Sequence, residues 1–175
     1  LDGAAGRLTF AAGDGTARVA TTGADGWGSQ EGFHLSLAVS PDERLLGLGD
    51  QQRKRIDLRG KTADMWIRNV NRYIPVPLLL SSGGWGVLVN TTRRHRWDLA
   101  AARDDRVAVN AEAGTLDFYI FTGDYPALLD AYTELTGKPI LPPKWSFGLW
   151  FCCRNNASDH EVLTDAYLWR NETLP

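Results

Sequence analysis

The fold is decided by the stretch Leu78-Leu79-Leu80-Ser81-Ser82-Gly83-Gly84-Trp85-Gly86-Val87-Leu88-Val89. Two apolar runs flank a small turn that contains glycine, a pattern typical of a β-hairpin. Both runs are almost continuously apolar, whereas a strand with one solvated face alternates polar and apolar residues. The pattern therefore predicts two central strands that are covered on both faces.

Further short strands are expected on either side of this hairpin. Residues 8–20 predict another hairpin, because two short runs flank a Gly13-Asp14-Gly15 turn. Residues 34–39 alternate polar and apolar side chains, as expected of a strand with one buried face. Additional strands are predicted at residues 106–109 and 116–121. Many short strands separated by glycine turns favour a mainly β protein, built as a sandwich of antiparallel sheets.

The pattern changes from strand to helix after residue 123. Apolar residues recur at helical spacing from residue 128 to residue 135. Asp124 is the expected N-cap, and Gly137 is expected to end the helix. We therefore assign residues 1–140 to a β-sandwich domain that ends in this helix.

Residues 141–175 form a second region. It opens with Pro142-Pro143, a stiff link, and continues with Trp145–Cys153, which we predict to be a buried strand. Ser158 and Glu161 then have the spacing of a capping box at the start of a second helix. A strand, a loop and a helix in this order predict the opening of an α/β unit.

Charge and hydropathy exclude some classes of partner. The formal net charge is −2, so no basic surface for nucleic acid or an anionic membrane is indicated. No apolar run approaches the roughly 20 residues that a membrane-spanning helix needs. The chain starts at Leu1 without a signal peptide and ends at Pro175 like an interrupted sequence. We expect it to be part of a longer protein that binds neither nucleic acid nor membrane.

The cysteines and histidines indicate no metal site. Cys152 and Cys153 are adjacent, which strains a disulfide between them and does not match a metal-ligand spacing. Buried thiols are favoured, which fits a reducing, cytoplasmic compartment, with secretion as the alternative. The three histidines are scattered along the sequence.

Three segments together resemble one known family. They are Gly47-Leu48-Gly49-Asp50 followed by Asp57-Leu58-Arg59-Gly60-Lys61, the proline-led hairpin Pro75–Asn90, and the passage from Tyr132 through Pro142-Pro143 to Trp150. In order and spacing they are similar to motifs of glycoside hydrolase family 31, among them "D-x-R-G-K" and "L-P-P-x-W-S-F-G-x-W".

The resemblance implies a fold and a reaction. The fold is an N-terminal galactose-mutarotase-like β-sandwich, followed by a (β/α)8 barrel that would begin within residues 141–175. The reaction is hydrolysis of an α-linked oligosaccharide or glycoside, of the α-glucoside or α-xyloside type, with retention of configuration. It needs two carboxyl groups about 5 Å apart. In the family both are aspartates on later barrel strands, so no catalytic residue is expected in this chain, and no metal or other cofactor. The oligomeric state stays open, a homo-oligomer included.

The resemblance also implies substrate contacts. In the family, the loop between the "R-G-K" strand and the proline-led hairpin reaches the sugar. Here that loop contains Asn71 and the four residues chosen as candidate contacts, Arg68, Asn69, Arg72 and Tyr73. Asn69 stands where many members have Asp, so an uncharged amide would meet a sugar hydroxyl. Arg154 would follow the first barrel strand, where barrels place their active sites. The alternative is that these side chains hold the loop or are solvated.

Other features have more ordinary interpretations. The basic stretch Arg93–Trp97 could bind phosphate, but a solvated turn is favoured. Trp27, Trp66, Trp85 and Trp145 could stack on sugars, but burial in the core is the commoner role. A second hypothesis for the whole chain is a non-catalytic carbohydrate-binding or scaffold module.

Overall fold

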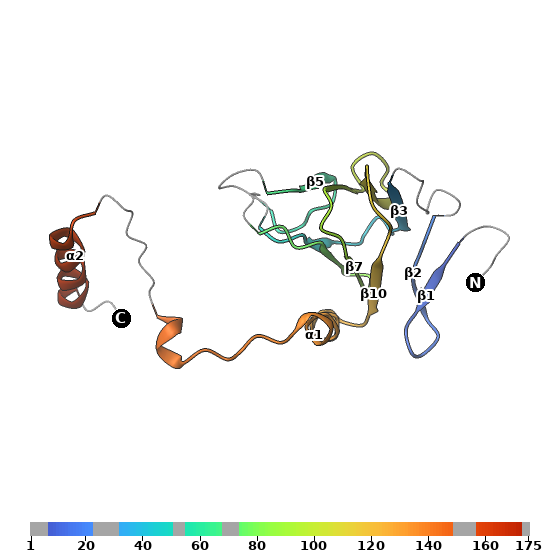
Figure 1. Ribbon diagram of the computed structural model, residues 1–175. Coiled ribbons are helices and arrows are strands. Elements are labelled where there is room, and N and C mark those ends of the chain that lie inside the picture. The colour runs from blue at the N-terminus through green and yellow to red at the C-terminus, as the bar shows by residue number, and fades with distance from the viewer. Residues whose placement is uncertain (1–6, 23–31, 51–54, 68–73, 149–156, 173–175) are drawn as a thin grey trace. The chain divides into compact units, whose positions relative to one another are not determined.

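The computed structural model describes residues 7–22, 32–50, 55–67, 74–148 and 157–172 (Figure 1). The chain divides into two compact units, residues 1–137 and residues 138–175. The first unit contains all ten described strands and one helix. The strands are β1 (Thr9–Ala11), β2 (Ala17–Ala20), β3 (Phe33–Ala38), β4 (Leu45–Gly47), β5 (Lys61–Met65), β6 (Leu78–Ser81), β7 (Trp85–Val89), β8 (His95–Leu99), β9 (Arg106–Ala111) and β10 (Phe118–Thr122), and the helix is α1 (Tyr125–Thr136).

The strands form two four-stranded sheets and a separate hairpin. One sheet has the order β10-β7-β6-β4, the other has the order β3-β9-β8-β5, and β1 pairs with β2 alone. All described pairings between these strands are antiparallel. A single apolar core takes side chains from both larger sheets, among them Leu35, Trp97 and Val109 from one and Leu79, Val87 and Val89 from the other. The predicted mainly β sandwich is confirmed.

The β6–β7 hairpin is buried on both faces, as its apolar sequence predicts. Leu79 is opposite Val87 in the strand register, and both point into the core between the sheets. Leu78 is opposite Leu88, and both belong to a second cluster that contains Leu128 of helix α1. The two strands occupy the centre of their sheet, between β10 and β4. One face therefore meets the other sheet, and the opposite face meets the helix.

A carboxylate holds the turn of this hairpin. Glu43 accepts a 2.8 Å hydrogen bond from the indole Nε1 of Trp85 and a short one from the Ser81 hydroxyl. Its other oxygen accepts from the Ser40 amide at 2.8 Å. A Cβ on Gly83 would lie only 2.7 Å from this carboxylate. Glu43 thereby satisfies the polar groups of a turn at the rim of the core.

Helix α1 begins and ends where the sequence predicts. The Asp124 side chain accepts a 3.0 Å hydrogen bond from the Ala127 amide, which satisfies a free N–H of the first turn. Gly137 ends the helix with φ +102°, a conformation that favours glycine. The helix packs on the sandwich through Leu128, its buried residue.

The second unit contains a 3-10 helix, η2 (Lys144–Phe147), and helix α2 (Asp159–Asn171). The capping box of α2 is confirmed, because the Ser158 hydroxyl accepts from the Glu161 amide while the Glu161 carboxylate accepts from the Ser158 amide. Along α2 exposed apolar side chains include Leu163, Tyr167 and Leu168.

The predicted buried strand is wrong over Trp145–Phe147, its first three residues. These residues form η2, and Trp145 and Phe147 are 73% and 69% exposed. The reason is local: the amide and the hydroxyl of Ser146 both donate to the Pro143 carbonyl, at 2.9 and 2.7 Å, which closes a helical turn. The remainder of the prediction, to Cys153, falls on residues 149–156, outside the described part of the chain, except Gly148, which lies in a bend.

Two neighbouring leucines of α1 test whether the helix covers the hairpin. Leu128 is fully buried, whereas Leu129 is 47% exposed. We expect Leu128→Ala to lower the free energy of unfolding by about 2–5 kcal/mol, because it leaves a cavity against Leu78 and Leu88. Leu129→Ala should change it by about 0.5 kcal/mol or less. Chemical denaturation of both variants measures the difference, and equal losses would show that α1 does not cover the sheet.

Candidate functional site

The predicted substrate contacts lie in two gaps of the described chain. Arg68, Asn69, Arg72 and Tyr73 fall within residues 68–73, and Arg154 falls within residues 149–156, so all five are outside the described residues. The structure therefore brings none of them together, and their roles stay predictions. What it does show are the two segments that flank residues 68–73. We call Trp66–Ile67, which follows β5, the outgoing arm, and residues 74–77, which lead into β6, the return arm.

The Asp57 carboxylate of the "D-x-R-G-K" motif accepts hydrogen bonds from backbone amides. It accepts from the amides of Leu45, at 3.2 Å, and Arg59, at 3.0 Å. Burial acts to raise the pKa of Asp57, but these two hydrogen bonds and the nearby positive charges of Arg55 and Arg44 leave the pKa below its ordinary value. Asp57 is therefore an ionised anchor for the start of β4.

Arg59 and Gly60 of the same motif also have structural roles. The Arg59 guanidinium donates to the carbonyl of Glu43 at 3.2 Å and to the carbonyl of Asp104. Gly60 has φ +75°, and its amide donates to the Leu99 carbonyl at 2.7 Å, just before β5 begins. The motif fixes the path of the chain into β5 and hence the outgoing arm.

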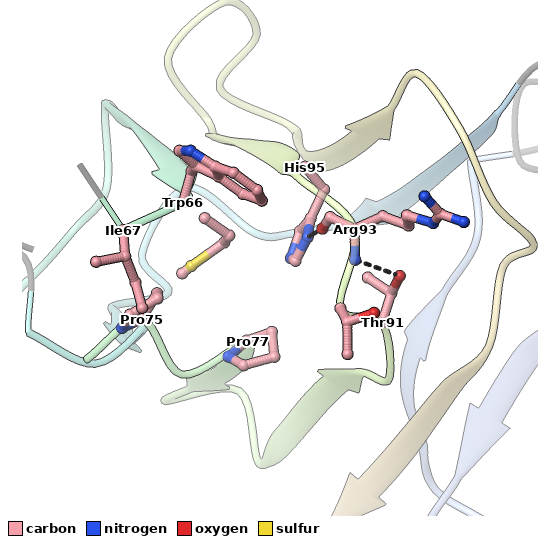
Figure 2. A pocket seen from close by; sticks show the side chains of 9 residues that line it. Trp66, Ile67, Pro75, Pro77, Thr91, Arg93 and His95 are labelled. Carbon is pink, nitrogen blue, oxygen red and sulfur yellow. Dashed lines mark hydrogen bonds between the residues drawn. The ribbon is translucent and has the colours of Figure 1, made fainter. Parts of the chain in front are cut away.

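A pocket of about 430 Å³ opens between the two arms and the segment that leads into β8 (Figure 2). Its walls are mostly apolar, and polar side chains come from the residues just before β8 and from His95, the first residue of that strand. The lining residues are Met65, Trp66, Ile67, Pro75, Pro77, Thr91, Thr92, Arg93 and His95. Figure 2 shows the rings of Trp66 and His95 on one side of the pocket and Pro77 on the other. Its size is in the range of small-molecule sites.

His95 is the most unusual polar group of the pocket. Its side chain is buried, and its Nδ1 lies 2.9 Å from the Arg93 carbonyl oxygen. A carbonyl only accepts, so Nδ1 carries the proton and Nε2 is left as an acceptor. Nε2 is buried without a hydrogen-bond partner. Burial lowers the pKa of His95 below its ordinary value, although the Arg93 carbonyl and the Asp64 charge oppose the shift. The imidazole is therefore neutral at pH 7, and its acceptor atom Nε2 is closed off from solvent.

The expectation of a solvated turn at Arg93–Trp97 is wrong beyond residue 94. His95–Leu99 is strand β8, in which His95, Trp97 and Leu99 are buried while Arg96 is exposed. The alternation of side chains from His95 to Leu99 has the period of a strand, and this signal could have identified β8 from the sequence. The basic residues make this alternation harder to recognise, because they occupy positions that face outward.

Arg94 is held in an ion pair across the sheet edge. Its Nε and Nη2 donate to the two carboxylate oxygens of Asp64 on β5, at 3.1 and 2.9 Å. This bidentate contact, together with the Asp64 charge, raises the pKa of Arg94. The Arg94 guanidinium therefore already donates to a carboxylate, whereas a phosphate-binding site would need those donors for the phosphate.

Of the tryptophans predicted as possible sugar platforms, Trp85 is fully buried and Trp66 is 48% exposed, whereas Trp27 lies outside the described residues. Trp145, at 73%, is also exposed, but it lies in the second unit. Among the described tryptophans, Trp66 is the one that lines the pocket between the two arms. Within the described ranges, no group of three or more His, Cys, Asp or Glu side chains could hold a metal ion. None of the helices described is long and apolar enough to cross a bilayer.

Comparison with known proteins identifies the family. Residues 5–98 match the model of the glycosyl hydrolase 31 N-terminal galactose mutarotase-like domain. The chain therefore belongs to glycoside hydrolase family 31, as the sequence motifs predict. It is 34% identical over 120 residues to α-xylosidase XylQ of Lactiplantibacillus pentosus, with 65% of this chain and 16% of the relative aligned. It is 31% identical over 155 residues to an α-xylosidase of Emericella nidulans, with 83% of this chain and 20% of the relative aligned.

The fold is shared with solved structures. A dextranase of Flavobacterium johnsoniae, complexed with glucose, matches 97% of this chain and 22% of its own, with a TM-score of 0.81 and 23% identity. A cycloalternan-degrading enzyme of Trueperella pyogenes, in complex with isomaltose, matches the whole chain and 26% of its own, with a TM-score of 0.70 and 24% identity. The chain thus spans only about a sixth to a quarter of the length of these relatives.

The buried imidazole predicts a pH dependence of stability. The pKa of folded His95 lies below its ordinary value of 6.5, so the neutral form is favoured by folding. Its contribution is fully present above about pH 6.5 and is lost as the pH falls through the folded pKa. We expect the unfolding temperature to drop between about pH 7 and pH 5 more in the natural protein than in His95→Asn, whose amide still reaches the Arg93 carbonyl but does not titrate. Identical pH profiles by thermal melting would contradict this.

Proposed function

We propose that the protein carrying this chain is a retaining glycosidase that hydrolyses terminal α-linked sugars of the α-xyloside or α-glucoside type. The observation that carries the proposal is membership of glycoside hydrolase family 31, through a domain match over residues 5–98. Relatives named α-xylosidase and α-glucosidase support the substrate class. We propose a cytoplasmic location from the adjacent cysteines, Cys152 and Cys153.

The hydrolysis requires two carboxyl groups. In our proposal both lie outside this chain. One aspartate attacks the anomeric carbon and forms a glycosyl-enzyme, while a second protonates the departing glycosidic oxygen. The second then takes a proton from water, which attacks the anomeric carbon and releases the sugar with its configuration retained. We place both aspartates on later strands of a (β/α)8 barrel that begins within residues 141–175.

In this proposal the chain contributes one wall of the sugar site. Its proposed contacts with sugar hydroxyls are Arg68, Asn69, Arg72 and Tyr73, and we propose Arg154 as a further substrate-binding residue. The support is geometric: both arms leave rigid strands, β5 at Met65 and β6 at Leu78, so a contact between them is held by the sandwich. Asn69 donates and accepts without charge, which suits a neutral sugar.

The reaction is tested with the full-length protein on nitrophenyl α-xyloside and α-glucoside. We expect turnover, and NMR should detect the α-anomer as the first product, because two inversions restore the configuration. The 175-residue chain alone should show no turnover, because it lacks the carboxyl pair. A β-anomer as first product would contradict the retaining mechanism. No hydrolysis of any α-glycoside would contradict the proposal as a whole and favour the non-catalytic carbohydrate-binding or scaffold module.

Asn69 is tested against a neighbour of the same type. We expect Asn69→Ala in the full-length protein to raise KM by about 3–10-fold, the cost of one or two neutral hydrogen bonds. Asn71→Ala is the matched control, since it removes the same amide two residues along and should leave KM within about twofold. Equal changes of KM in the two variants would contradict a contact between Asn69 and the sugar.

A further inference from the structure

A second pocket, also of about 430 Å³, lies where the β1–β2 hairpin meets the edge strand β3. It shares no lining residue with the pocket between the two arms. Its charged lining residues are Arg7, Arg103, Asp105 and Arg106. We call it the edge pocket.

Backbone hydrogen bonds frame the edge pocket. The Thr22 amide donates to the Ser36 carbonyl at 3.0 Å, which joins the hairpin to β3. The Val39 amide donates to the Asp105 carbonyl at 2.9 Å, which joins the end of β3 to the start of β9. The lining residues are therefore carried by backbone that the sheet holds in place, as a binding site requires.

The charges that line the edge pocket do not cancel. Three guanidiniums face one carboxylate, which leaves two positive charges. Arg103 and Asp105 offset each other, because the Arg103 Nε donates to one carboxylate oxygen at 3.0 Å and its Nη2 donates to the other. The hydrogen bond from Arg103, together with the charges of Arg103 and Arg106, keeps the pKa of Asp105 below its ordinary value. Asp105 is thus ionised at neutral pH, and the surplus is positive.

Arg7 and Arg106 carry this surplus charge. Among the residues that the structure describes, no carboxylate forms an ion pair with either guanidinium. The two come from separate elements, because Arg7 precedes β1 and Arg106 begins β9. The whole chain has a net charge of −2, so the positive charge gathered here is a local feature and not a consequence of composition.

We propose that the edge pocket binds a phosphate group, either free or carried by a sugar, through the guanidiniums of Arg7 and Arg106 and the exposed hydroxyl of Thr22. A phosphate monoester carries a charge of about −1.5 to −2 at pH 7, which two guanidiniums balance. Guanidinium groups donate paired hydrogen bonds to phosphate oxygens. Donors from separate elements suit a tetrahedral anion, whereas a carboxylate has only two oxygens, in one plane. The inference is independent of the proposed hydrolysis.

Isothermal titration calorimetry of the full-length protein tests the site, at constant ionic strength set with sodium chloride. We expect saturable binding of sodium phosphate, and binding of sodium acetate that is about tenfold weaker or more, because acetate lacks one charge and two oxygens. Glucose 6-phosphate, with glucose as its control, distinguishes the source: tighter binding than inorganic phosphate indicates a sugar phosphate, and equal binding indicates the free anion. No saturable binding of either phosphate, or equal binding of acetate, would overturn the inference.

Three arginine variants test whether binding occurs in the edge pocket. We expect Arg7→Gln and Arg106→Gln each to weaken phosphate binding by about tenfold or more, because each removes hydrogen bonds between charged groups. Arg96→Gln is the matched control: it removes the same charge from an exposed position of β8 outside the pocket, and screening should leave the affinity within about twofold. Equal weakening in all three variants would overturn the inference, since it would show attraction by the general field of the protein.

Thermal melting supplies an independent measurement. Melting in chloride shows that each variant is folded, and should Arg106→Gln fail to fold, Arg7→Gln decides. Phosphate should raise the unfolding temperature of the natural protein and of Arg96→Gln equally, because a ligand that binds the folded state stabilises it. The rise should be smaller in Arg7→Gln and in Arg106→Gln. The same rise in all of these proteins would contradict binding in the edge pocket, whether or not the protein hydrolyses an α-glycoside.

Discussion

The structure depends on the burial of both faces of the β6–β7 hairpin. Strands that expose neither face to water need a partner on each side, and the chain supplies a second sheet on one side and helix α1 on the other. This requirement accounts for the order of the elements, because the helix follows β10, the strand that pairs with β7. The polar atoms at the turn are satisfied by Glu43, so the hairpin reaches the rim of the core without unpaired groups at Ser81 and Trp85.

The same hairpin determines where the candidate site lies. The return arm ends where β6 begins, and the Val89 amide donates to the Pro77 carbonyl at 3.0 Å, so the arm is tied to β7 as well. The outgoing arm leaves β5, whose neighbour β8 contributes His95 to the pocket between the arms. A rigid sandwich thus supports a site built from short connecting segments, which is how many enzymes separate stability from function.

Features that depend on neighbouring residues could be predicted from the sequence. The β6–β7 hairpin, the N-cap Asp124 and the capping box of Ser158 and Glu161 are all determined within a few positions along the chain. The sequence predicts a strand where η2 forms, because an apolar run of this length fits a buried strand as well as a buried helix, and the pattern does not show that Ser146 bonds to Pro143.

The site was less predictable because it depends on contacts between distant residues. The pocket forms only when β5, the return arm and the segment before β8 come together. The Gly47-Leu48-Gly49 motif could be recognised from the family, but its left-handed backbone against Ile74 and Val76 could not, since glycine permits such a path without requiring it. The roles of Arg68, Asn69, Arg72, Tyr73 and Arg154 come from the family resemblance alone.

The most direct test is a crystal structure of the full-length protein with a bound α-linked disaccharide. The account predicts that a polar atom of Arg68, Asn69, Arg72 or Tyr73 lies within about 3.2 Å of a sugar oxygen. A sugar held entirely by other parts of the protein, with none of these four residues in contact, would contradict it.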